Sequence, residues 1–118
     1  MSDDAKTARR LRDLEGFAAE AAHIVRQGED AYRAPTPDGA LLRNAGAHVL
    51  VKIATVVEKL PDSFKASYVT VDWRAITRMR NLVAHHYDKV NDDLMFQTLR
   101  VDVPRLIRDL GLGDGSAG

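Results

Sequence analysis

The stretch that decides the fold spans residues 73–87 and reads WRAITRMRNLVAHHY. Its apolar side chains recur at the 3.6-residue period of an α-helix and form one arc of the helical wheel: Trp73, Ile76, Met79, Leu82 and Val83. Arg80 falls inside this arc, whereas Asn81 and His85 lie one turn apart on the opposite, polar side. A guanidinium keeps its charge and is costly to bury unpaired. The position of Arg80 therefore suggests a site rather than a solvated surface.

The sequence on either side of this stretch predicts further helices. The four main ones are expected to start near Asp4, Ala40, Asp72 and Asp92 and to end near Gly28, Leu60, Tyr87 and Leu110. Segment 34–39, rich in Pro and Gly, is expected to form a loop, and Pro61 to open a short extra helical turn. The β-branched segment 50–57 also fits a strand, but its length without turn signals favours a helix. Pro104 is expected to bend the last helix or divide it.

Helices of this length joined by short loops predict an all-α fold, an up-and-down four-helix bundle. We expect this helical domain to span residues 4–110. The remaining segment, 111–118, contains four Gly in eight residues and is expected to be a disordered tail.

Composition limits the classes of protein that the chain can belong to. Its 118 residues are enough for one domain, and the absence of Cys excludes disulfides and thiolate metal sites. His23 and His48 have no metal-ligand spacing, so we interpret both as non-functional. No apolar run approaches the length of a membrane span, and residues 1–4 are too polar to begin a signal peptide. A soluble, cytoplasmic protein without a membrane partner is expected.

Charge is balanced over the chain but not locally. The 17 basic and 17 acidic side chains argue against a protein that coats nucleic acid. Between Asp72 and Asp88 there is no Asp or Glu, and five Arg or His side chains fall there: Arg74, Arg78, Arg80, His85 and His86. This pattern fits brief engagement with a phosphodiester, with Arg74 and Arg78 as supporting RNA or anion contacts. An ordinary charged helix face fits it equally well.

These residues resemble those of the HepT-like toxins of the HEPN superfamily. Members carry an Arg, four intervening residues, a His, one residue and a Tyr, and Arg80, His85 and Tyr87 match that spacing. Asn81 stands where the family has a polar residue after the Arg. The resemblance also includes the lead-in from Trp73 and the later Leu94, Phe96, Leu99 and Pro104-Arg105-Leu106, and it covers about residues 8–110. It implies a HEPN-like bundle.

The resemblance implies a metal-independent endoribonuclease toxin that needs no cofactor and acts as a homodimer. Arg80, His85 and Asn81 would be its catalytic residues. His85 would transfer the protons when the 2′-hydroxyl of RNA attacks the phosphate, and Arg80 would stabilise the charge that develops there. Relatives often carry an acid where Thr55 stands, so Glu58 is the substitute candidate for the acidic partner of Arg80.

Tyr87 is implied to be a regulatory position. In HepT-like, type VII-like toxin–antitoxin systems, the antitoxin is a nucleotidyltransferase with an MNT domain that attaches AMP to the motif Tyr. AMPylation of Tyr87 would place bulky negative charge beside His85 and repel an RNA phosphate. The expected partners are therefore RNA, a second copy of the chain and a cognate antitoxin.

Simpler interpretations remain open for each residue. Arg80 also fits a structural Arg paired with an acid of the first or second helix, and His85 a surface residue. His86 fits a packed core His, and Tyr87 a side chain that closes the core. At the level of the whole chain, the alternatives are a catalytically inactive HEPN scaffold that binds a nucleotidyltransferase, and an interaction domain whose apolar arc is only an oligomerisation seam.

Overall fold

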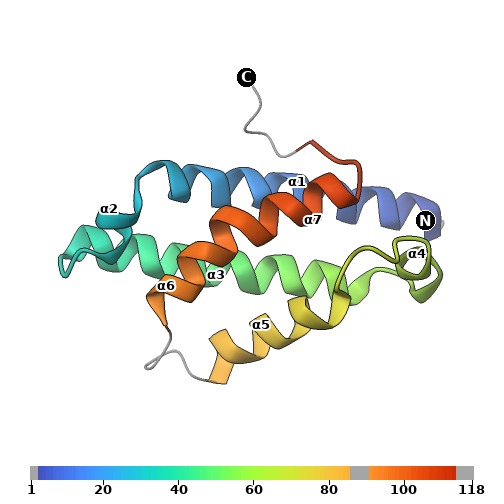
Figure 1. Ribbon diagram of the computed structural model, residues 1–118. Helices are drawn as coiled ribbons and strands as arrows, with labels where there is room; N and C mark the ends of the chain where they lie inside the picture. The colour runs from blue at the N-terminus through green and yellow to red at the C-terminus, as the bar shows by residue number, and fades with distance from the viewer. Residues whose placement is uncertain (1–2, 86–90, 114–118) are drawn as a thin grey trace.

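The computed structural model describes residues 3–85 and 91–113, without the side chains of residues 82, 84 and 85. Its elements are α1 (Asp3–Arg26), α2 (Glu29–Arg33), α3 (Pro37–Lys59), α4 (Asp62–Ala66), α5 (Trp73–His85), α6 (Asp92–Gln97), the π-helical turn η2 (Thr98–Asp102) and α7 (Val103–Asp109). The described residues contain no strand, so the predicted all-α fold is confirmed. In Figure 1, α1, α3, α5 and the combined α6–η2–α7 helix alternate in direction, as an up-and-down bundle does.

The helix α3 is the central element of the bundle. It begins at Pro37, three residues before the predicted start near Ala40, because Thr36 caps it and accepts the Gly39 N–H at 3.1 Å. Proline is favourable at the first helical position, where no amide hydrogen is needed. By length and composition alone α3 could cross a membrane, but in this fold seven of its residues are buried among the other helices. The strand alternative for segment 50–57 is wrong.

Between α1 and α3 the structure corrects the sequence prediction. We expected only a loop after Gly28, but residues 29–33 form the short helix α2. The ring of Tyr32 anchors α2: it is 1% exposed and lies against the ring of Phe96, with centroids 5.3 Å apart. A Cβ on Gly46 of α3 would lie 3.2 Å from this ring, so a small residue there permits the close approach.

The last helix runs without a break from Asp92 to Asp109, so Pro104 does not divide it. Proline lacks an amide hydrogen and clashes with the carbonyl four residues earlier. The wider π-helical turn η2 immediately precedes α7 and accommodates Pro104 near the start of that helix. At the N-terminal end, the Asn91 side chain caps α6 by accepting the N–H groups of Asp93 and Leu94.

The described chain continues past α7 to Gly113. Gly111 adopts a φ of 71° and donates its N–H to Arg108, while Leu112 donates to Ile107 at 2.9 Å, the pattern of a Schellman cap. Leu112 packs against the core, and the Gly113 N–H donates to Glu15 at 3.0 Å. Residues 111–113 are therefore held against the end of the bundle. Residues 114–118 of the predicted tail lie outside the described residues.

The core lies where α1, α3 and the α6–η2–α7 helix meet. Its largest fully buried side chains are Tyr32, Leu14, Leu50, Ile53, Met95, Leu99, Ile107 and Val57. At the start of the chain, α1 already includes Asp3, so Asp4 lies within the first turn rather than at the predicted cap position.

Candidate functional site

The start of α5 is fixed by two side chains that the sequence singled out. Asp72 accepts the backbone N–H of Ala75 at 3.0 Å, which confirms its predicted role as the helix cap. The indole N–H of Trp73 donates to the carbonyl of Lys65 at 3.1 Å and ties α5 to α4. Trp73 is half-buried against the core. These contacts set the direction in which α5 leaves its loop and so position the motif residues farther along.

Arg80 pairs with an acid of the central helix. Its Nη1 donates to Oε1 of Glu58 at 2.7 Å, and the two side chains are 39% and 34% exposed. Glu58, the substitute candidate from the sequence, is thus the acidic partner of Arg80. Thr55, at the position where the family resemblance led us to look for an acid, donates to the Val51 carbonyl at 2.8 Å. Arg80 is therefore neither buried nor free: its forked guanidinium is held by one acid and still open to solvent.

The other predicted contacts of α5 face solvent. Arg74, Arg78 and Asn81 are all exposed, as expected for the polar side of the helix. Arg78 lies 3.8 Å from a carboxylate oxygen of Asp72, and both side chains are more than two-thirds exposed, so this contact adds little to stability. Asn81 directly follows Arg80 in the chain. The two side chains leave the helix about 100° apart, so the amide of Asn81 lies on the exposed polar side and the guanidinium of Arg80 nearer the apolar arc.

The remaining motif residues are only partly described. His85 is the last residue of α5, so its backbone is helical. Five residues from Arg80 to His85 correspond to about 7.5 Å along the helix axis and about 140° around it. His86 and Tyr87 lie outside the described residues. The roles predicted for His85, His86 and Tyr87 therefore stay predictions.

The two earlier histidines, His23 and His48, lie away from α5 on the helices α1 and α3. Within residues 3–85 and 91–113, no three His, Asp or Glu side chains are grouped in a way that could hold a metal ion. His23 of α1 and His48 of α3 are exposed and line one shallow groove between these helices, with Glu20 and Lys52. Lys52 already pairs with Glu20 at 2.9 Å. This proximity of the two histidines was not predictable from their spacing in the sequence.

The geometry defines what α5 can do chemically. From residue 73 to the end of α5 the helix has basic side chains and no acid. Among the described residues, Glu58 pairs with one of these side chains and Asp72 caps the helix. A partly exposed guanidinium held by one carboxylate can exchange part of that contact for a phosphate oxygen, to which it donates two parallel hydrogen bonds. The described part of α5 is thus suited to bind a phosphate at Arg80.

Comparison with known proteins agrees with this chemistry. A family model described as "Ribonuclease HepT-like" matches residues 9–111. A protein of Methanocaldococcus jannaschii named "Putative RNase" is 29% identical over 58 residues, which cover 49% of this chain and 48% of the relative. A second "Putative RNase", from Caldanaerobacter subterraneus subsp. tengcongensis, is 30% identical over 66 residues, 56% of this chain and 59% of the relative.

In these two comparisons the chain spans about half the length of the relatives that it matches. No solved structure matches the chain significantly. The family model, in contrast, covers almost the whole helical domain and includes α5 with the Arg80 and His85 positions. The chain belongs to the HepT-like ribonuclease family.

Proposed function

We propose that this protein is a metal-independent endoribonuclease of the HEPN type that acts as a cytoplasmic homodimer and toxin. The observation that carries the proposal is the placement of Arg80: a permanently charged guanidinium on the family's motif helix, held at 2.7 Å by Glu58 and 39% exposed. A buried, fully paired Arg would favour a structural role. A partly exposed one is available to a substrate.

The reaction needs two proton transfers and one stabilising charge. The 2′-hydroxyl of RNA loses its proton as its oxygen attacks the adjacent phosphorus. The bond from phosphorus to the 5′-oxygen then breaks as the 5′-oxygen gains a proton. His85 can carry out either transfer near neutral pH. Arg80 would donate to the nonbridging oxygens as negative charge develops on them, with Asn81 holding a phosphate oxygen or orienting the imidazole. The products are a 2′,3′-cyclic phosphate and a 5′-hydroxyl.

Dimerisation is part of this mechanism. Because about 140° of helix rotation separates Arg80 from His85, one protomer is poorly placed to present both side chains to one phosphate. Two copies of α5 facing each other across a two-fold axis would bring Arg80 of one protomer to His85 of the other. Arg74 and Arg78, both exposed on α5, would then contact the flanking phosphates.

Regulation is proposed at Tyr87. A nucleotidyltransferase antitoxin would join the Tyr87 oxygen to the α-phosphorus of ATP and release pyrophosphate. The added phosphate lies two residues from His85 in the sequence, so it would repel an RNA phosphate and occupy its space.

The direct test is RNA cleavage by the purified protein in EDTA, with Arg80→Ala and His85→Ala as variants. We expect 2′,3′-cyclic phosphate ends from the wild type and a loss of at least about 100-fold in each variant, the scale for removing a transition-state donor. Arg9→Ala removes an exposed Arg of α1, far from the motif in sequence, and is the matched control. Cleavage that needs a divalent metal or survives both substitutions would overturn the proposal.

A mixing experiment tests the composite site. Arg80→Ala and His85→Ala proteins are each expected to be inactive, but a heterodimer of the two would retain one intact Arg80–His85 pair across the interface. Random exchange of protomers would restore about a quarter of the wild-type rate. No recovery, with heterodimers shown by native mass spectrometry, would mean that both groups act from one protomer.

An inactive wild type would direct attention to Tyr87 and to the scaffold alternative. Intact-mass measurement showing added AMP, lost in Tyr87→Phe, would support silencing by an antitoxin. A dimeric, unmodified and inactive protein that binds a nucleotidyltransferase would instead favour the scaffold.

A further inference from the structure

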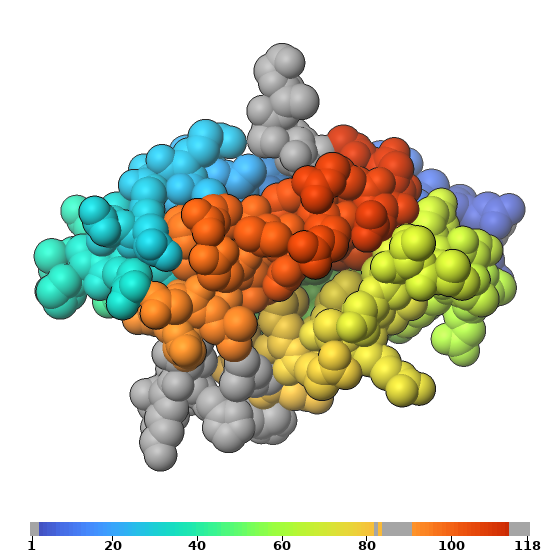
Figure 2. Space-filling view, viewed as in Figure 1, coloured from blue at the N-terminus to red at the C-terminus, as the bar shows by residue number. Residues whose placement is uncertain are grey.

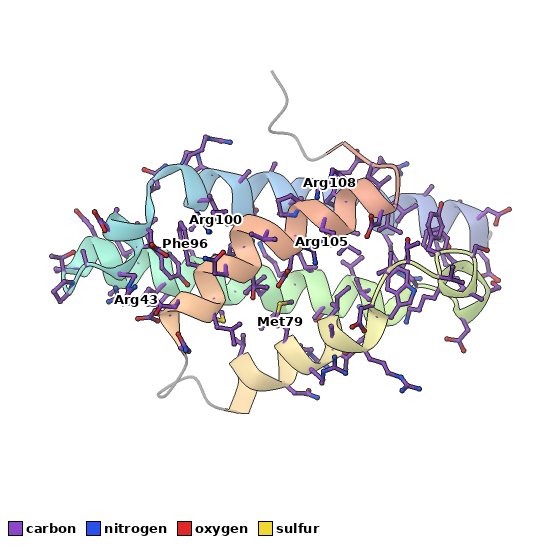
Figure 3. The ribbon with its side chains drawn as sticks, viewed as in Figure 1. Arg43, Met79, Phe96, Arg100, Arg105 and Arg108 are labelled. Carbon is purple, nitrogen blue, oxygen red and sulfur yellow. The ribbon has the colours of Figure 1, made fainter. Side chains whose placement is uncertain are left out.

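A groove separates α5 from the C-terminal helix. Its volume is about 400 Å³, and its lining is mainly apolar. The apolar lining residues are Ala75, Ile76 and Met79 of α5, Ile53 of α3, and Leu94, Met95, Val103 and Leu106 of the C-terminal helix. Figure 3 shows Met79 pointing from α5 toward the helix that carries Arg105. In Figure 2 the surfaces of α5 and of the C-terminal helix form the two sides of this region. Leu94 is 48% exposed at the groove, which leaves a large apolar side chain in contact with solvent.

The shape of the groove is elongated. Along the C-terminal helix the lining residues extend from Leu94 to Asp109, about 22 Å at 1.5 Å per residue. Along α5 they extend from Asp72 to Met79, about 10 Å. A trough of this length between two helices fits the apolar face of another helix, whose anchoring side chains recur at i, i+3 or i+4, and i+7.

The charges on the rim restrict the occupant further. Asp102 and Asp109 are exposed, lie seven residues apart and thus face the same side of the C-terminal helix, two turns from each other. Asp72 lies on the opposite wall, and Arg105 is the basic residue of the lining. Because Arg78 lies 3.8 Å from Asp72, the acidic balance of the rim comes from Asp102 and Asp109 against Arg105, although the chain as a whole is neutral. An occupant with basic side chains would therefore complement it.

We propose that this groove binds a basic amphipathic helix of a partner protein. The apolar face of that helix fills the trough over Ile76, Met79 and Leu94, and Lys or Arg side chains two turns apart meet Asp102 and Asp109. Because the helix would contact α5 and the C-terminal helix together, its binding would couple the motif helix to the rest of the bundle. The proposal concerns binding and does not depend on ribonuclease activity.

The probe is a fluorescein-labelled 15-residue peptide, constrained as a helix, with Leu at i, i+4 and i+7 and Lys on both flanks. Its binding is measured by fluorescence anisotropy at low and high salt. A second peptide carries Glu in place of every Lys. The protein variants are Asp102→Asn/Asp109→Asn at the rim and Met79→Ser in the trough. Asp3→Asn/Asp13→Asn makes the same charge change on α1 as a control, and circular dichroism verifies that each variant folds.

The expected result is saturable binding of the Lys peptide that weakens about fivefold in Asp102→Asn/Asp109→Asn, stays unchanged in the α1 control and loses its dependence on the rim charges at high salt. Met79→Ser should weaken binding at both salt concentrations. Equal binding of the Lys and Glu peptides, or no binding by the folded wild type, would overturn the proposal. A change of sedimentation coefficient in Asp102→Asn/Asp109→Asn or Met79→Ser would also overturn it, because the groove would then be the seat of a second copy.

Discussion

The helices α1 and α5 both pack against α3, but they are built differently. From α1, Leu14 and Ala21 are fully buried against the bundle. In α5, among the side chains that the structure describes, Val83 alone is buried, and Ile76 and Met79 are only partly covered. The comparison indicates that the packing of α1, α3 and the C-terminal helix supplies most of the folding stability. The helix α5 is less buried, and its Arg74, Arg78, Arg80 and Asn81 side chains stay at least partly exposed to solvent.

The strongest test of this contrast compares two truncations of similar size. Leu50 of α3 is completely buried, so Leu50→Ala should lower the free energy of unfolding by about 2–5 kcal/mol. Ile76→Ala on α5 removes a partly exposed side chain at the groove and should cost about 1 kcal/mol. Urea denaturation measures both. Equal losses would mean that α5 is as integral to the core as α3, and the contrast would fail.

A second prediction concerns the buried phenol of α2. Burial, together with the negative charge of Asp92, raises the pKa of Tyr32 from 10.0 to about 12, while Arg43 acts in the opposite direction. The folded state therefore holds this proton more tightly than the unfolded state. The resulting stability is fully present below about pH 10 and is lost as the pH rises through 12, up to about 2–3 kcal/mol.

The measurement is the pH dependence of urea unfolding between pH 8 and about 12, compared with Tyr32→Phe. The variant lacks the ionisable group and should lose less stability over this range than the wild type does. Parallel curves for the two proteins would show that Tyr32 is not the group responsible. Tyr32 lies away from α5, so its ionisation should change amide hydrogen exchange in α5 only through global unfolding of the protein.

Part of this fold and of the candidate site was predictable from the sequence, and part was not. The start of α5 followed from Asp72, because a cap uses only the local backbone. The helix α2 was not predictable, because a helix of five residues carries too little periodicity. The burial of its Tyr32 depends on Phe96, which is distant in the chain. The sequence offered Glu58 as partner for Arg80, but the 22-residue separation left that pairing to the packing of α5 on α3. The groove depends on the spacing between helices, which no periodicity encodes.

The two helix caps offer a finer comparison. Thr36 accepts the Gly39 N–H at the start of α3, and Asp72 accepts the Ala75 N–H at the start of α5. Replacing either cap with Ala should cost about 1 kcal/mol. Thr36→Ala should lower the global stability, because α3 unfolds only with the whole bundle. Asp72→Ala should chiefly increase amide hydrogen exchange in α5, where fewer buried contacts oppose local opening. A uniform increase throughout the protein in Asp72→Ala would contradict this distinction.

The smallest expected change in stability is also the most informative about the site. Glu58→Gln keeps the size of the side chain but removes its charge, so the pair with Arg80 weakens. Both side chains are about one-third exposed, and the cost to the free energy of unfolding should be at most about 1 kcal/mol. The rate of RNA cleavage should nevertheless fall, because the carboxylate that orients the Arg80 guanidinium is lost.

Glu20→Gln is the matched control for this prediction. It weakens the pair between Glu20 and Lys52, which joins α1 to α3 at 2.9 Å and is comparably exposed. Both variants should unfold at nearly the same urea concentration, and only Glu58→Gln should slow cleavage. Two ion pairs of similar length on α3 would then differ in their effect on cleavage. If both variants retained full activity, the Glu58–Arg80 pair would be structural, and positioning of Arg80 would have to come from the packing of α5 alone.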